Sequence, residues 1–174
     1  VPPLRKPRTP ASIQIELTMD ERGVEFWRQA WRNPAYDVLS LGVEPLALGA
    51  NAATEKSGQE IDVLMYRQDF PVGAARIGVQ GLTTSAHIVA MALYRETRTE
   101  QLTKLLLATA MRAGLARGAT MVFAPGETDA DRELCEKLGF IDLGKMVCYA
   151  ARSENVNGNQ EHDDLAEPVL AVRR

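Results

Sequence analysis

Three basic side chains lie close together at the start of a long amphipathic stretch: Arg95, Arg98 and Lys104. The first N–H groups of a helix have no intrahelical partner and lie at the positive end of its dipole. Added cations there favour an anionic ligand such as a phosphate. The same stretch reads TRTE at residues 97–100, which fits a capping box. In that alternative Thr97 caps the helix, Glu100 reaches back to it, and the helix end needs no anion.

The first half of the chain is expected to contribute antiparallel strands to the sheet that positions this stretch. Apolar residues alternate over residues 12–17, which predicts a strand. Asp20 is a suitable N-cap for the helix that follows. The apolar residues at helical spacing in that helix are Val24, Trp27 and Trp31. Residues 60–68 and 73–80 then predict the two strands of a hairpin.

The second half has a strand–helix–strand pattern. Residues 86–93 form a mostly apolar run with small side chains, as in a central strand buried on both faces. An apolar stripe follows in a helix that Gly118 ends, and its members are Leu102, Leu105, Leu106, Ala110, Ala113 and either Leu115 or Ala116. A short strand at 120–124 precedes a helix within 128–140 that Gly139 ends. Its inward side chains are expected to be Ala130, Leu134 and Leu138. Residues 145–151 predict a last strand, and the order indicates a single α/β domain with a mixed central sheet flanked by helices.

Composition limits the class of protein. The 174 residues are 45% hydrophobic and 25% charged, which is average for a globular domain. The net charge of -3 gives no attraction to nucleic acid or to an anionic membrane, so neither is expected as a partner. The chain has no signal-peptide pattern and no apolar run near the roughly 20 residues of a membrane span. Cys135 and Cys148 lack metal-site spacing, so we expect a cytoplasmic protein without a metal.

Three segments are expected along the chain. Residues 1–10 are rich in proline and basic side chains and predict a flexible arm. Residues 11–152 hold the domain. Residues 153–174 form a polar, largely flexible tail with an apolar end, LAEPVLAVRR, that is able to dock.

Two stretches resemble motifs of the GNAT family of acyl-coenzyme A-dependent N-acyltransferases. The first, LYRETRTEQLTKLLL at residues 93–107, is similar to the family's V-x-P-E-Y-R-G-x-G-I-G-x-x-L-L. Leu93 takes the valine position, Glu96 the glutamate and Arg98 the arginine. The second, LCEKLGF at residues 134–140, is similar to the family's LYEKLGF. The resemblance covers residues 60–151 and implies the GNAT fold and transfer of an acyl group, expected to be acetyl, from a coenzyme A thioester to an amine.

The resemblance also implies where an acyl-coenzyme A co-substrate lies. The pantetheine is expected along the backbone of Met91, Ala92 and Leu93. The pyrophosphate is expected at the start of the helix, and its candidate contacts are Arg98, Thr99, Gln101, Leu102, Thr103 and Lys104. The family's three glycine positions hold Thr99, Gln101 and Thr103, whose side chains narrow the approach of the backbone to a phosphate. Glu100 adds a carboxylate in the same turn.

Three side chains are predicted as catalytic: His87, Glu96 and Cys135. Cys135 stands where the family has a tyrosine that protonates the departing thiolate; the alternative is a small buried residue facing the sheet. A general base must deprotonate the amine, and the unperturbed pKa of His87, about 6.5, suits this task. The alternative for His87 is a strand-end histidine half in solvent. Glu60, Asp62 and Glu96 are further candidate bases, and Glu96 alternatively pairs with Arg98.

The segment from residue 35 to 58 is apolar at first and then small and polar. Its apolar side chains are Val38, Leu39, Leu41, Val43, Leu46 and Leu48. Such a segment is expected to contact an apolar acceptor, a long acyl chain or another protein chain, most simply a second copy in a homodimer. The acceptor amine then belongs to a small molecule or a protein. A second function stays open: a catalytically silent GNAT-like module for assembly or protein binding, which the lost glycines and tyrosine favour.

Overall fold

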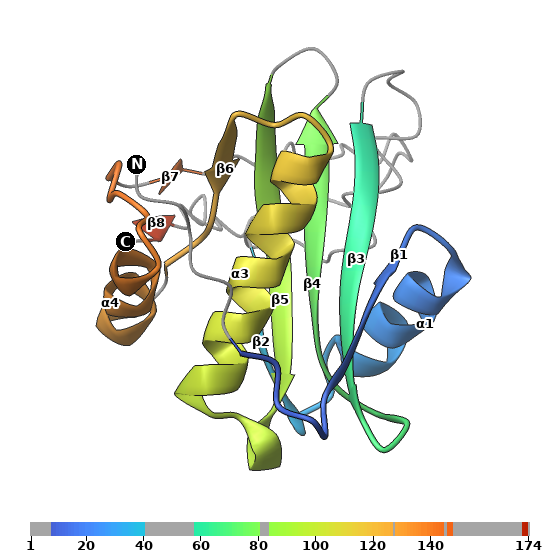
Figure 1. Cartoon of the computed structure of the whole chain (residues 1–174). Helices are drawn as coiled ribbons and strands as arrows, with labels where there is room; N and C mark the ends of the chain where they lie inside the picture. The colour runs from blue at the N-terminus through green and yellow to red at the C-terminus, as the bar shows by residue number, and fades with distance from the viewer. Residues whose placement is uncertain are drawn as a thin grey trace, which may run out of the picture.

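The strands form one main sheet in the computed structural model, which describes residues 8–40, 58–80, 84–126, 128–144, 146–147 and 172–173 (Figure 1). Five strands are hydrogen-bonded in the order β1 (Gln14–Thr18), β3 (Gly58–Arg67), β4 (Phe70–Gln80), β5 (Ser85–Tyr94) and β2 (Tyr36–Ser40). All four pairings in this series are antiparallel. A sixth strand, β6 (Met121–Phe123), pairs with β5 in parallel, so the predicted α/β fold with a mixed sheet is confirmed.

Helices cover both faces of this sheet. On one face α3 (Glu100–Ala116) lies across β4 and β5 (Figure 1), and its predicted apolar stripe packs on Ile61, Val63 and Ile77. On the other face α1 (Glu21–Ala30) buries Phe26, Trp27 and Ala30 against Leu64, Ala74 and Ala90. The two sets alternate along the strands because successive side chains point to opposite faces. The helix α4 (Asp129–Lys137) follows β6.

The predicted hairpin of β3 and β4 turns at Gln68 and Asp69. Both residues have positive φ values, 50° and 63°, as a two-residue turn between right-twisted strands requires. The glycines predicted to end helices are also confirmed, because Gly118 and Gly139 have φ values of 92° and 89°.

Several details differ from the predicted pattern. In α1 the buried residues are Gly23, Phe26, Trp27 and Ala30, whereas Val24 and Trp31 are only partly buried. Ala130 is exposed, because α4 packs mainly through Leu134 and Leu138. Leu115 and Ala116, the two candidates for the last member of the α3 stripe, are both exposed, because the buried face of α3 ends at Gly114. The predicted last strand is described only as β7 (Met146–Val147). It pairs with β8 (Val172–Arg173) at the end of the predicted tail and not with the main sheet.

A buried charged cluster joins α1 to the sheet. The Asp62 carboxylate on β3 accepts hydrogen bonds from Arg76 Nε and Nη2 at 2.9 and 2.7 Å, and from Trp27 Nε1 at 2.8 Å. Asp62 and Arg76 are both 3% exposed. A Cβ added at Gly23 would lie 2.0 Å from Asp62 Oδ2, so the close approach of α1 to the carboxylate requires glycine. Asp62 is therefore a structural residue in this fold, and its position does not suit the general base considered above.

We predict that Asp62→Ala lowers the free energy of unfolding by about 3 kcal/mol or more, because it leaves the buried Arg76 charge without its main partner. Glu60, 3.3 Å from Arg76, compensates only in part. Urea denaturation measures the loss. Glu16→Ala is the control, since it removes an exposed ion pair with Arg22 and should cost under about 1 kcal/mol. Equal effects of the two substitutions would contradict the structural role of the buried cluster.

Candidate functional site

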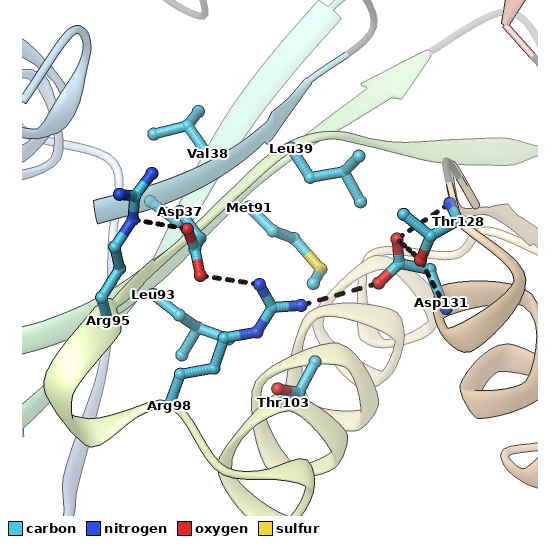
Figure 2. Close-up of a pocket in the computed structure, with 11 residues that line it drawn as sticks. Asp37, Val38, Leu39, Met91, Leu93, Arg95, Arg98, Thr103, Thr128 and Asp131 are labelled. Atoms are coloured by element: carbon cyan, nitrogen blue, oxygen red, sulfur yellow. Dashed lines mark hydrogen bonds and ion pairs between the residues drawn. The ribbon is translucent and has the colours of Figure 1, made fainter. Parts of the chain in front are cut away.

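A pocket of about 250 Å³ lies where the C-terminal half of β5 meets the first turns of α3 and α4 (Figure 2). Three adjacent elements contribute most of its wall: β2, β5 and the turn between β5 and α3. The lining residues are Asp37, Val38, Leu39, Met91, Ala92, Leu93, Arg95, Arg98, Thr103, Thr128 and Asp131. The wall is apolar at β5 and charged at its rim, so the pocket suits a ligand with an apolar arm and an ionic head.

The Arg98 guanidinium lies at the mouth of this pocket, between two carboxylates (Figure 2). Its Nη1 donates to Asp37 Oδ2 at 2.7 Å, and its Nη2 lies 3.8 Å from Asp131 Oδ1. Arg95 Nε donates to the other oxygen of Asp37 at 2.7 Å. The hydrogen bond from Arg98 lowers the pKa of the Asp37 carboxyl, which therefore stays ionised. An incoming phosphate must compete with Asp37 for both arginines.

Helix α3 begins two residues later than the predicted capping box. A short 3-10 turn, η1 (Arg95–Thr97), leads out of β5, and the N-cap is Thr99. The Thr99 hydroxyl accepts from the Leu102 N–H at 3.2 Å, and the Thr99 carbonyl accepts from the Thr103 N–H. Thr97 instead donates its hydroxyl proton to the Tyr94 carbonyl. The prediction that Thr97 caps the helix is wrong because this turn uses Thr97 to close on β5.

Glu100 does not reach back to a cap either. Its carboxylate pairs with Lys104 Nζ at 2.6 Å, one helical turn on, and Lys137 lies 3.8 Å away. The hydrogen bond from Lys104 lowers the pKa of Glu100, so a negative charge stays at the helix start. Within the described ranges, the N–H groups of Glu100 and Gln101 have no acceptor. These two donors are the part of the helix end still available to an anion.

The backbone of Met91 and Leu93 is already paired with β2. The Arg95 N–H donates to the Ala35 carbonyl at 2.9 Å, which sets the phase of the antiparallel ladder. Hydrogen-bonded pairs alternate in such a ladder, so the next two along it are Asp37–Leu93 and Leu39–Met91. The outward N–H and C=O groups predicted to receive a pantetheine are therefore engaged by the chain itself.

His87 lies in the other half of β5. Its ring stacks on Phe123 of β6, with ring centres 4.9 Å apart, and burial lowers the pKa of its imidazole. The strand register places Glu60, Gly78 and His87 in one row across the sheet. Burial raises the pKa of the Glu60 carboxyl. Because Gly78 has no side chain, nothing from that position separates the carboxyl from the imidazole on this face.

The other two predicted catalytic residues lie outside the pocket wall. Cys135 packs against the core one helical turn beyond Asp131, and burial raises the pKa of its thiol to about 11. The thiol therefore stays protonated at neutral pH. Glu96 is exposed in η1, and among the described residues it has no hydrogen-bond or ion-pair partner. The alternative pairing of Glu96 with Arg98 is not seen.

The structure brings together part of the predicted co-substrate site. Five of its residues line the pocket: Met91, Ala92, Leu93, Arg98 and Thr103. The four that do not line it are Thr99, Gln101, Leu102 and Lys104. The residues missed by sequence reasoning are Asp37 of β2, and Thr128 and Asp131 at the start of α4. Val38 and Leu39 are predicted only as apolar side chains of the 35–58 segment, and both line the pocket. In the described part of the chain no group of three His, Cys, Asp or Glu side chains offers a metal site.

Comparisons with known proteins place the fold. No protein-family model matches the sequence, and no curated protein matches it significantly. Among solved structures, aminoglycoside N-acetyltransferase AAC(6')-Iy in complex with CoA has a TM-score of 0.56 and 16% identity, over 80% of this chain and 99% of that chain. A transcriptional regulator from Bacillus halodurans has a TM-score of 0.57 and 14% identity, over 80% of this chain and 99% of that chain. A GNAT family acetyltransferase from Staphylococcus aureus has a TM-score of 0.51 and 10% identity, over 80% of this chain and 99% of that chain.

Identities this low show the fold alone. The chain has the fold of the GNAT acetyltransferases, as its motifs implied. None of the helices in the described ranges is both long and apolar enough to cross a lipid bilayer.

We predict that His87 titrates below the usual midpoint of about 6.5, since burial beside Phe123 disfavours the charged imidazolium. NMR titration of the ring protons measures this midpoint in the full chain. Phe123→Ala should expose the ring and raise the midpoint, whereas Phe70→Ala, which removes an exposed ring on the β3–β4 hairpin, should leave it unchanged. A midpoint at or above about 6.5 would contradict the burial of His87.

Proposed function

We propose that this chain is an N-acyltransferase that transfers an acyl group, acetyl in the simplest case, from a coenzyme A thioester to an amine. The observation that carries the proposal is the Arg98 guanidinium at the mouth of an apolar pocket, beside the start of α3, within this fold. The similar structure AAC(6')-Iy is an aminoglycoside N-acetyltransferase in complex with CoA, which supports the same reaction class. The acceptor amine belongs to a small molecule or a protein.

The groups at the pocket suit such a co-substrate. Arg98 and Arg95 supply the charge-assisted donors that phosphates prefer, and the N–H groups of Glu100 and Gln101 are available beside them. The thioester supplies an acyl group bonded to a good leaving group. The apolar side chains Met91 and Leu93 would exclude water from the acyl carbon.

The chain's own residues then have separate roles in moving protons. His87 is neutral at neutral pH because its pKa is lowered, so it is able to accept a proton from the ammonium form of the acceptor. It lies four residues before Met91, roughly 13 Å along the strand. The bulge between β4 and β5 puts His87 on the α1 face and Met91 on the α3 face, so an acceptor that uses His87 would approach from the α1 face. Cys135 keeps its proton, as an acid for the departing thiolate must, and Glu96 stays a further candidate near the phosphate end.

Other parts of the proposal rest on sequence alone. A cytoplasmic location, the absence of a metal and the boundaries at residues 10 and 152 stay predictions. The homodimer through the 35–58 segment also stays a prediction, because residues 41–57 lie outside the described residues. Of its apolar side chains only Val38 and Leu39 are described, and both lie in β2 at the pocket.

A second candidate function is the catalytically silent module for assembly or protein binding. One specific observation favours it: β2 already fills the outer edge of β5 beside the pocket, and its Asp37 holds Arg98. The transcriptional regulator among the similar structures also carries this fold. Calorimetric titration with acetyl-coenzyme A, followed by an acetyl-transfer assay with polyamine and aminoglycoside acceptors, separates the two functions.

We predict that Arg98→Ala weakens binding of acetyl-coenzyme A by roughly tenfold or more. Each charge-assisted hydrogen bond to a phosphate is worth about 1.5–3 kcal/mol, and about 1.4 kcal/mol corresponds to tenfold. Calorimetry on the full chain measures the dissociation constant. Arg112→Ala removes an exposed arginine farther along α3 and should leave binding unchanged. A dissociation constant that Arg98→Ala does not alter would exclude this pocket as the site.

We also predict that Glu100→Gln tightens binding about two- to fivefold while lowering the free energy of unfolding by only about 1 kcal/mol or less. The carboxylate repels an incoming pyrophosphate and occupies Lys104, but it does not cap the helix. Glu25→Gln is the control, because it removes an exposed carboxylate from α1 and leaves the start of α3 unchanged. Weaker binding by Glu100→Gln would show that the carboxylate helps to organise the site.

A further inference from the structure

The outer edge of β5 is divided between two strands of opposite direction. Residues 85–87 pair in parallel with β6, and residues 90–94 pair antiparallel with β2. The inner edge of β5 is occupied by β4. An extended ligand arm can therefore form strand-like bonds to Met91 and Leu93 only where β2 now lies. This geometry conflicts directly with an acyl thioester bound along β5.

The hold of β2 on this edge is limited. Its end residues Tyr36 and Ser40 are buried, but the three residues between them are only partly buried. Tyr36 is anchored firmly, since its hydroxyl donates to the Pro71 carbonyl at 2.8 Å and its ring contacts those of Phe26 and Tyr94. Ser40 at the other end is buried and also has an interaction partner. Within β2, only the three residues between them line the pocket, Asp37, Val38 and Leu39, so the middle of β2 is the part that can leave β5.

The ion pairs of β2 join its Asp37 to arginines, one of which, Arg98, is the residue predicted to bind the ligand. Asp37 accepts from Arg98 and Arg95, whose side chains are 44% and 59% exposed. Ion pairs this exposed are weak, so an anion that binds Arg98 can compete with Asp37. A phosphate that binds the Arg98 guanidinium therefore also removes the ion pair that holds β2.

We propose that β2 is a displaceable strand that closes the β5 edge in the absence of ligand, with the Asp37–Arg98 ion pair as its latch. The inference rests on the proposed function. A coenzyme A thioester that engages Arg98 would release Asp37, and its pantetheine amides would replace the hydrogen bonds of Leu39 and Asp37 to β5. The affinity for coenzyme A then depends on how much more stable the pairing of pantetheine with β5 is than the pairing of β2 with β5, and not on the pocket alone.

Amide hydrogen exchange of the full chain with and without coenzyme A tests the exchange of strands. In the free protein the N–H groups of Asp37 and Leu39 should be protected, together with those of Met91 and Leu93. Saturating coenzyme A should speed exchange of the two β2 amides roughly tenfold or more, while Met91 and Leu93 stay protected by the ligand. Unprotected β2 amides in the free protein, or β2 amides that stay protected in the complex, would overturn the displaceable strand.

Two pairs of variants test the latch and the ladder by calorimetry with coenzyme A. Asp37→Asn should tighten binding about two- to fivefold, and more than Asp131→Asn, which removes a carboxylate near Arg98 that is not on β2. Leu39→Pro removes an N–H that bonds to β5 and should also tighten binding. Leu39→Ala, which trims the same side chain but keeps that N–H, should tighten binding less.

The outcomes separate this inference from the proposed function. Binding by the wild type with equal effects of Asp37→Asn and Asp131→Asn, or of Leu39→Pro and Leu39→Ala, overturns the displaceable strand and leaves the acyltransferase intact. Failure of the wild type, Asp37→Asn and Leu39→Pro all to bind coenzyme A or acetyl-coenzyme A overturns both. Arg98→Ala is unsuitable here because it removes the latch and the ligand contact together.

Discussion

A β-strand has only two edges, and the use of the edges of β5 determines what the rest of the site can do. One edge is committed to β4 over most of its length. The other begins with β6 and ends with β2, so every outward backbone group at Met91 and Leu93 has a partner within the chain. Beyond residue 87 the edge of β5 no longer pairs with β6, and β2 pairs with it there from residue 90 onward. Ligand access is thus a competition between pairings.

The cations around the pocket, like the backbone groups of β5, already have partners within the chain. Arg95 and Arg98 pair with Asp37, and Lys104 pairs with Glu100. Cations that suggest a phosphate site in the sequence are therefore each balanced by a nearby carboxylate. With glycine absent from the turn, a bound anion depends more on side-chain donors than on close backbone approach. Such a site exchanges one set of ion pairs for another, which gives a modest net gain and a strong dependence on salt.

The sequence predicts this fold well where periodicity is strong and local. The apolar stripe of α3, the hairpin of β3 and β4 and the glycine at Gly118 depend on neighbouring residues, and all are confirmed. It predicts the site poorly because the decisive contacts join distant residues. Asp37 and Arg98 are 61 positions apart. YDVLS does not alternate, since Val38 and Leu39 are adjacent, so the sequence predicts no clear strand at β2. Only the three-dimensional arrangement shows which edge these five residues join.

The core explains how β2 is able to leave without unfolding the domain. The larger core cluster lies between α3 and strands β3, β4 and β5, and its described buried members include none from β2. The smaller cluster under α1 takes only Tyr36 from β2 as a buried member, with Val38 packed at its margin. The buried Asp62–Arg76 pair and Trp27 fasten α1 to β3 and β4, away from β2. Stability therefore resides in the inner strands and the two helices, whereas β2 is anchored at its two buried ends and held more weakly between them. A strand with this distribution of contacts can exchange for a ligand while the scaffold that positions Arg98 and His87 stays folded.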